Sequence, residues 1–167
     1  TALPRLPDPR TAVVTGAGGP AGIGRATARA LAESGWHVAL VDINAEGLAG
    51  VEQELRKAGH QNLLALPSDI ASESSVTEVY QRIDSELPPV VGLVNLAGIA
   101  YTVPLHECSL AEFERVMAVN VTGSFLMLRA AAARMIPQGV GRIVNTSSIS
   151  ALDGGGTYSK GVYATAK

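Results

Sequence analysis

The chain has 167 residues, of which 47% are apolar and only 4% aromatic, and its formal net charge at pH 7 is −2. This length is sufficient for one domain with a core of aliphatic side chains. The nearly balanced charge gives no electrostatic reason to expect binding to nucleic acid or to an anionic membrane. The single cysteine, Cys108, excludes an intrachain disulfide. That is typical of a reducing compartment, so we expect a cytoplasmic protein.

Residues 1–10 contain three prolines and no apolar core of the kind found in signal peptides. We therefore expect an extended lead-in, followed by a single domain over residues 11–167. No uninterrupted apolar run reaches the roughly 18 residues that a membrane-spanning helix needs. No group of His, Cys, Asp or Glu has convincing metal-ligand spacing, so no metal site is expected.

Short apolar segments alternate with longer segments of helical period. Strands are expected in TAVVTG, WHVALVD, NLLALPSD, VVGLVNLAG and GRIVNTSS. Their nearly continuous hydrophobicity is typical of strands that are buried on both faces of a parallel sheet. Helices are expected over residues 24–34, 44–58, 72–87, 109–119 and 120–136. This alternation predicts an α/β fold with a Rossmann-like, doubly wound parallel sheet.

Several of these helices carry start signals. Asn44 is expected to cap the second helix. Ser75 with Glu78, and Ser109 with Glu112, have the spacing of a capping box in the third and fourth helices.

A glycine loop, GAGGPAGIG over residues 16–24, joins the first strand to the first helix. In a doubly wound sheet this turn faces the crevice at the carboxyl ends of the strands. Gly16, Gly22 and Gly24 would let the backbone approach a pyrophosphate. The helix start at Ile23 would supply free N–H groups and the positive end of the helix dipole. The loop therefore indicates a dinucleotide site.

Two other interpretations of the loop are a glycine-rich turn without a ligand and the phosphate loop of an NTPase. The second fails because Arg25 and Ala26 stand where that loop needs a lysine and a hydroxyl residue. Asp42 favours a dinucleotide, because it ends the second strand 18 residues after Gly24. An acid at about this distance binds the adenosine ribose and repels a 2′-phosphate. The next residue is Ile43 rather than a cation, so NAD is favoured over NADP.

Near the end of the chain, Tyr163 precedes Lys167 by four residues, which places both side chains on one face of a helix. Tyr158 has a valine at the equivalent position. A free phenol ionises near pH 10, so a phenolate at neutral pH needs roughly 4 kcal/mol of stabilisation. A cation about 4 Å away supplies an energy of that order at an effective dielectric constant near 20. The pair is therefore a candidate acid–base centre.

Taken together and in order, TG, GIG, the strand-end aspartate, LVNLAG, VMAVNVTG, GRIVNTSS and the YxxxK pair resemble the short-chain dehydrogenase/reductase family. The resemblance covers nearly the whole chain. It implies a catalytic group of Asn120, Ser148, Tyr163 and Lys167. It also implies cofactor contacts at Gly16, Gly22, Ile23, Gly24, Asp42, Ile43, Asp69, Ile70, Asn95, Ala97, Gly98, Tyr163 and Lys167.

The chain departs from the usual family pattern at three places. The glycine loop is two residues longer, Leu96 stands where an asparagine is common, and Ser148 lies 15 residues before Tyr163, a longer spacing than usual. Ser147 and Ser150 are rivals for the role of Ser148. Ser148 is preferred because it follows the last strand directly.

The resemblance implies an oxidoreductase that transfers a hydride between a secondary alcohol or ketone and NAD(H), with Tyr163 as general acid/base. In this scheme Ser148 hydrogen-bonds the substrate oxygen, Lys167 supports Tyr163 and binds the nicotinamide ribose, and Asn120 holds a water for proton exchange. Alternatives are an NADPH-dependent carbonyl reductase of the 3-oxoacyl type and a non-catalytic NAD-binding protein of the same fold.

Family members are longer than this chain, and their last strands and substrate loop follow the YxxxK helix. We therefore expect a C-terminally truncated domain whose activity belongs to the longer parent protein, itself a homodimer or homotetramer. Polyols, sugar acids, hydroxysteroids and acyl thioesters remain open as substrates.

Overall fold

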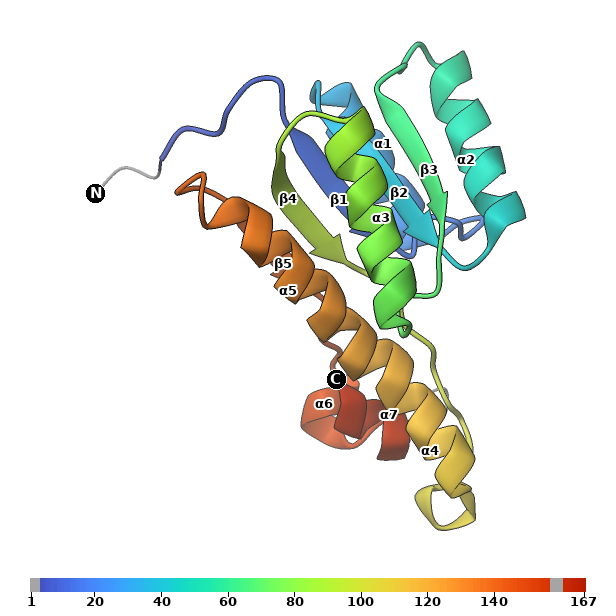
Figure 1. Ribbon diagram of the computed structural model, residues 1–167. Coiled ribbons are helices and arrows are strands. Elements are labelled where there is room, and N and C mark those ends of the chain that lie inside the picture. The colour runs from blue at the N-terminus through green and yellow to red at the C-terminus, as the bar shows by residue number, and fades with distance from the viewer. Residues whose placement is uncertain (1–3, 157–160) are drawn as a thin grey trace.

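The computed structural model describes residues 4–156 and 161–167, so Tyr158 lies outside the described residues. Its centre is a parallel sheet of five strands in the order β3-β2-β1-β4-β5 (Figure 1). The strands are β1 (Thr11–Thr15), β2 (His37–Asp42), β3 (Leu63–Pro67), β4 (Val90–Asn95) and β5 (Arg142–Asn145). The predicted Rossmann-like parallel sheet is confirmed.

The direction of strand addition reverses at β1, because β2 and β3 lie on one side of it and β4 and β5 on the other. β1 pairs in parallel with both β2 and β4. In a sheet of this kind the loops after the two central strands diverge, which opens a crevice beyond their carboxyl ends. The glycine loop follows β1, and residues 96–98, which we call the LAG segment, follow β4, so both border this crevice.

Helices cover both faces of the sheet (Figure 1). α1 (Ile23–Glu33) and α2 (Ala45–Lys57) lie on one face, while α3 (Glu73–Glu86) and α5 (Ser124–Met135) lie on the other. Val13 and Val14 of β1 are both fully buried but belong to opposite cores, because successive strand residues point to opposite faces. This is why the strands read as continuous apolar runs.

The predicted starts of these three helices are confirmed, but one of the predicted caps is wrong. The Asn44 side chain accepts a hydrogen bond from Gly47 N and caps α2. Ser109 and Glu112 form a complete capping box at α4 (Leu110–Met117). In α3 the cap is Ser72, whose hydroxyl accepts from Ser75 N. The serine-rich segment offered more than one cap, and the actual helix begins a turn before the predicted box.

The expected break at Asn120 does not occur. α4 continues through the π-helical segment η2 (Ala118–Gly123) into α5, so residues 110–135 form one uninterrupted helical segment. This helical segment is long enough, and has few enough charged residues, to cross a membrane by length and composition alone. The α5 side chains Leu126, Met127 and Ala131 instead pack into the core over the sheet.

The last part of the described chain is less buried than expected. β5 was predicted to be buried on both faces, yet Ile143 and Val144 are 37% and 53% exposed, because no helix of the described residues packs closely on β5. Beyond it come α6 (Ser150–Asp153) and α7 (Gly161–Ala166). α7 packs beside α4, and Gly161 lies close to Leu105 in the short helix η1 (Leu105–Glu107).

A buried phenol links two helices of one layer. Tyr80 donates a 3.1 Å hydrogen bond to the carbonyl of Met127, and burial raises its pKa. Tyr80→Phe should lower the free energy of unfolding by about 1 kcal/mol, the net value of one such bond. The unfolded phenol ionises first, so stability should fall as pH rises above about 10, and the variant should show less of this fall. Urea unfolding at neutral and alkaline pH measures both effects.

Tyr101→Phe is the matched control, because Tyr101 hydrogen-bonds Glu112 at the surface. At neutral pH it should leave the urea midpoint nearly unchanged. Equal midpoints for the two variants at neutral pH would contradict the role given to the Tyr80 bond.

Candidate active site

A cavity of about 490 Å³ opens at the carboxyl ends of β1, β2, β3 and β4. Its walls come from the glycine loop, the ends of β2 and β3, the LAG segment and α4. It is lined by Gly16, Gly19, Asp42, Ile43, Ser68, Asp69, Ile70, Leu96, Ala97, Gly98, Ile99, Arg115 and Val119. Seven of these residues were predicted cofactor contacts, namely Gly16, Asp42, Ile43, Asp69, Ile70, Ala97 and Gly98. Segments far apart in the sequence therefore share one cavity.

Thr15 connects the two loops that border the cavity. Its hydroxyl oxygen accepts hydrogen bonds of 3.0 Å from both Leu96 N and Ala97 N. The next residue, Gly16, has φ of +70°, and a Cβ there would lie 2.9 Å from Ala97 N. The backbones of the two loops therefore touch, and only glycine permits this approach.

Gly24 has a packing role rather than an open position beside a ligand. A Cβ at Gly24 would lie 2.1 Å from the Gly16 carbonyl oxygen, so α1 begins directly against the end of β1. Gly22 is exposed and is the N-cap residue of α1, where no side chain accepts a cap hydrogen bond. Ile23 is 70% exposed. The helix start thus presents free N–H groups beside the loop.

Asp42 is held in a fixed orientation by the backbone. Its Oδ2 accepts from Gly18 N at 2.8 Å and its Oδ1 from Asn44 N at 2.9 Å. A carboxylate oxygen can accept a further bond, so both oxygens remain able to bind hydroxyl groups. The following residue, Ile43, is 73% exposed and lines the cavity. A preoriented acid and an apolar surface therefore stand at one end of the cavity.

The end of β3 supplies the adjoining wall. Asp69 accepts from Ala71 N at 2.9 Å, and Ile70 is buried against Gly123 of the η2 segment. Ser68 has a buried hydroxyl without a hydrogen-bond partner among the described residues, although it lines the cavity. An unpaired buried hydroxyl at a cavity wall is a site for a polar ligand atom.

Asn95 supports the sheet from within. Its Nδ2 donates to Asn145 Oδ1 at 2.8 Å and to Ser124 O at 3.4 Å, so it ties the ends of β4 and β5 to α5. It is buried.

Asn120 holds the segment that follows LAG. Its Nδ2 donates to Ile99 O at 2.9 Å and to Val116 O at 3.0 Å, and its Oδ1 accepts from Ile99 N at 3.2 Å. The bond from Asn120 to Val116 joins the π-helical segment η2 to the last turn of α4. A Cβ on Gly98 would lie 2.5 Å from Asn120 Oδ1 and 3.4 Å from Lys167 Nζ. Gly98, which lines the cavity, thus lies next to both the Asn120 and the Lys167 side chains.

Lys167 connects α7 to the end of β5. Its Nζ donates to the Thr146 carbonyl at 3.1 Å and lies 5.8 Å from the centroid of the Tyr163 ring. Burial lowers the pKa of Lys167, because desolvation disfavours the ammonium form. The two side chains of the predicted YxxxK pair therefore lie near each other, and Lys167 contacts the segment after β5.

Ser148 lies in the turn after β5. Its hydroxyl accepts from Ser150 N at 3.2 Å and donates to Ser150 Oγ at 3.3 Å. Ser147 instead donates to the Lys167 carbonyl, and Ser150 is buried. In the described part of the chain no hydrogen bond joins Ser148 to Tyr163. Ser148 thus lies in the same turn as Thr146, which binds Lys167, but within the described residues it does not bond to Tyr163.

Sequence reasoning missed several residues of this site. Thr15 has a signal in hindsight, since a hydroxyl residue at the end of a buried strand needs a polar partner. Arg115 and Val119 share one helix face at i, i+4 spacing, and that face turns toward the cavity only because α4 packs there. Ser68 and Ile99 lie next to predicted residues.

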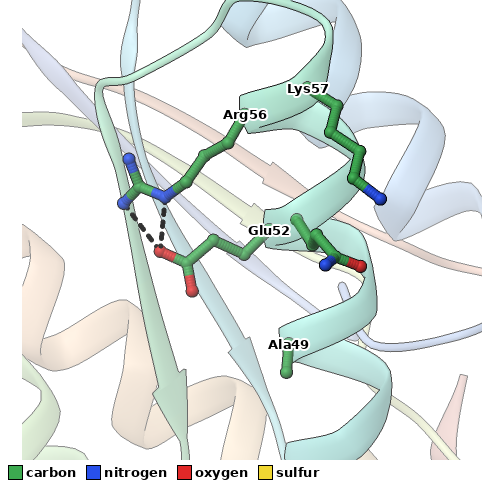
Figure 2. A pocket seen from close by; sticks show the side chains of 5 residues that line it. Ala49, Glu52, Arg56 and Lys57 are labelled. Carbon is green, nitrogen blue, oxygen red and sulfur yellow. Dashed lines mark hydrogen bonds and ion pairs between the residues drawn. The ribbon is translucent and has the colours of Figure 1, made fainter.

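A second hollow, of about 470 Å³, lies on the surface of α2 (Figure 2). Its lining includes Glu52 and Arg56, which form an ion pair with each other at 2.7 Å. Arg56 also donates to the carbonyl of Leu63, the first residue of β3. This hollow therefore lies toward the amino ends of the strands, away from the cavity described above.

The fold, with its crevice at the reversal point of a parallel sheet, defines a Rossmann-type α/β protein. A sequence profile described as short chain dehydrogenase matches residues 10–167. The chain belongs to this family, whose members are oxidoreductases that bind a nicotinamide cofactor.

Three relatives illustrate the likeness. The chain is 44% identical to cis-4-hydroxycyclohexanecarboxylate dehydrogenase of Sinomonas cyclohexanicum over 141 residues, which are 84% of this chain and 55% of that one. It is 37% identical to D-threitol dehydrogenase of Mycolicibacterium smegmatis, over 86% of this chain and 54% of the relative. The crystal structure of NAD⁺-bound xylitol dehydrogenase matches with a TM-score of 0.86 and 36% identity, over 95% of this chain and 59% of that one. The chain thus spans a little over half the length of these relatives.

Thr15→Val should test the junction between the two loops. Valine keeps the shape but removes the acceptor of two partly buried N–H groups, which should lower the free energy of unfolding by about 2 kcal/mol. Thr15→Ser is the matched control and should retain most of the stability, because it keeps the hydroxyl. Urea unfolding of the three proteins gives the comparison, and equal losses for valine and serine would contradict the hydrogen-bonding role.

Proposed function

We propose that this chain carries the cofactor half and the catalytic residues of an NAD-dependent dehydrogenase that interconverts secondary alcohols and ketones. One observation carries the proposal. Asp42 and Gly98 line the same cavity, and Gly98 also lies next to Asn120 and Lys167. A dinucleotide bound along this cavity would bring its nicotinamide end to the YxxxK pair.

The residues of the cavity fit a dinucleotide. Asp42 has oxygen lone pairs for the two ribose hydroxyls, and the adenine would lie against the exposed face of Ile43 and the wall of Ser68, Asp69 and Ile70. The N-terminus of α1 would face the pyrophosphate.

Asp42 supports NAD over NADP, because its carboxylate would repel a 2′-phosphate. Ile43 and Asn44, which follow it, carry no positive charge. Arg25, a cation in the first turn of α1, already donates to Glu54 and to the Pro20 carbonyl. The NAD⁺-bound xylitol dehydrogenase relative is consistent with this choice.

In the proposed reaction, Tyr163 is the general base that takes a proton from the alcohol. When bound, the nicotinamide cofactor accepts the hydride that leaves the alcohol carbon. Tyr163, as the phenolate, takes the hydroxyl proton of the alcohol, and Ser148 donates a hydrogen bond to the same oxygen. The Lys167 ammonium stabilises the phenolate, and Asn120 holds the backbone of Ile99 beside it. Reduction of a ketone reverses these steps.

The names of the three relatives favour a secondary alcohol. Threitol, xylitol and cis-4-hydroxycyclohexanecarboxylate each carry at least one secondary hydroxyl group. These substrates share no charge pattern, so the proposal stops at the class of secondary alcohol or ketone.

Tyr163→Phe in the longer parent protein should lower kcat by about 100- to 10,000-fold, the usual contribution of one acid–base group. The dissociation constant for NADH should change by less than about threefold, because the ring and the Lys167 contact remain. Steady-state kinetics and a fluorescence titration from Trp36 measure the two effects. A variant with near-normal kcat, or a parent protein that binds NADH but oxidises no alcohol in a broad panel, would contradict the proposal.

Asp42→Ala should weaken NADH binding by about tenfold or more, since charged hydrogen bonds to the ribose are lost. NADPH binding should improve relative to NADH, because the repulsion of the 2′-phosphate is removed. Asp42→Asn is the matched variant, which removes the charge and keeps one acceptor oxygen. It should relieve the discrimination with a smaller loss of NADH affinity. An unchanged preference in both variants would overturn the ribose assignment.

A further inference from the structure

The glycine loop separates two hollows. Gly16 and Gly19 line the cofactor cavity, whereas Gly18 and Pro20 line a hollow of about 380 Å³ on the other side, next to α2. This part of the loop is therefore a thin wall of backbone. Glycine loses more conformational entropy on ordering than any other residue, so such a wall needs contacts that hold its shape.

Two of these contacts involve Gly18. Its N–H donates to Asp42 Oδ2 at 2.8 Å. Its carbonyl oxygen lies against Gly47 in the first turn of α2, where a Cβ would approach to 2.0 Å. These contacts fix the first half of the loop but leave Pro20 and Ala21, which are exposed, without support from Asp42.

The second half of the loop is held by Arg25. One guanidinium nitrogen of Arg25 donates to the Pro20 carbonyl, and another donates to Glu54 Oε2 on α2. The other carboxylate oxygen of Glu54 pairs with Arg29, one turn further along α1. The planar guanidinium can donate in two directions at once, so it transmits the position of Glu54 to the loop.

The ion pair between Arg25 and Glu54 is also partly shielded from water. The side chains of Arg25 and Glu54 are 33% and 29% exposed. A charge-assisted bond in such a place is worth more than a surface ion pair of freely moving side chains.

We propose that Glu54 and Arg25 form a tether that holds the glycine loop in its cofactor-binding shape, so that Glu54, on α2 behind the loop, is a positioning residue for the dinucleotide. The inference rests on the proposed function. Without the tether, the ordering of the loop becomes a cost of binding, so cofactor affinity falls. The chemical step at Tyr163 and Lys167 is unaffected.

The first test needs no cofactor. Amide hydrogen exchange should be about tenfold faster at Gly19 and Ala21 in Glu54→Gln and in Arg25→Ala than in the unmodified chain, since one charged bond is lost. Circular dichroism and the urea midpoint verify that both variants fold. Arg25→Ala leaves the Glu54–Arg29 pair in place, so it remains informative if Glu54→Gln is unstable.

Two variants serve as matched controls. Glu52→Gln removes a carboxylate from the same helix, but this carboxylate pairs with Arg56 in the hollow of Figure 2. Arg29→Ala removes the other partner of Glu54 and leaves the bond from Arg25 to Pro20. Neither control should change exchange in the loop. Equal exchange in Glu54→Gln and Glu52→Gln would overturn the tether.

The second test uses the longer parent protein with NADH and with ADP-ribose, which lacks the nicotinamide. Calorimetry should show about tenfold weaker binding of both compounds to Glu54→Gln and Arg25→Ala. The KM for the cofactor should rise, while kcat at saturating cofactor should stay within about twofold of the normal value. Unchanged affinity would overturn the positioning role. If the unmodified protein binds neither compound, the proposed function fails, and the exchange experiment still decides the tether.

Discussion

The double hydrogen bond to the Thr15 hydroxyl is the constraint on which the arrangement of the cavity depends. It fastens the segment after β4 to the last residue of β1, at the point where the direction of strand addition reverses. Loops at such a point would otherwise diverge, because the following helices lie on opposite faces of the sheet. The bond holds them in contact at Gly16 and Ala97, so the floor of the cavity is backbone.

Asn120 has a comparable role for the segment that follows Gly98. Its side-chain amide accepts from the N–H of Ile99 and donates to the carbonyl of Ile99. These are the bonds that a neighbouring strand would otherwise make to this segment. It can do so only because the helix widens at η2, where the normal hydrogen-bond pattern gives way to a π-helical turn. Such irregularities are frequent at functional sites, since they redirect side chains without ending the helix. The continuous α4–α5 segment is the result.

Charge near the cavity is organised in pairs. Asp42 is oriented by two backbone N–H groups, while Arg25 and Arg29 are oriented by Glu54 on the outer side of the glycine loop. Arg25 and Arg29 are thus engaged at the interface of α1 and α2, while Asp42 lines the cavity. This arrangement also makes α2, which supplies Glu54 and Gly47, a support of the loop as well as a cover of the sheet.

The sequence alone determined the order of strands and helices, because buried parallel strands are continuously apolar and amphipathic helices are periodic. It also indicated Asp42, which ends a strand, and the YxxxK pair, which has helical spacing, while Asn120 was indicated only by the family resemblance. Only the tertiary structure showed that α4 and α5 are continuous, that Gly24 packs against Gly16, and that Glu54 reaches the glycine loop. These facts depend on contacts between residues far apart in the chain, and local periodicity carries no information about them.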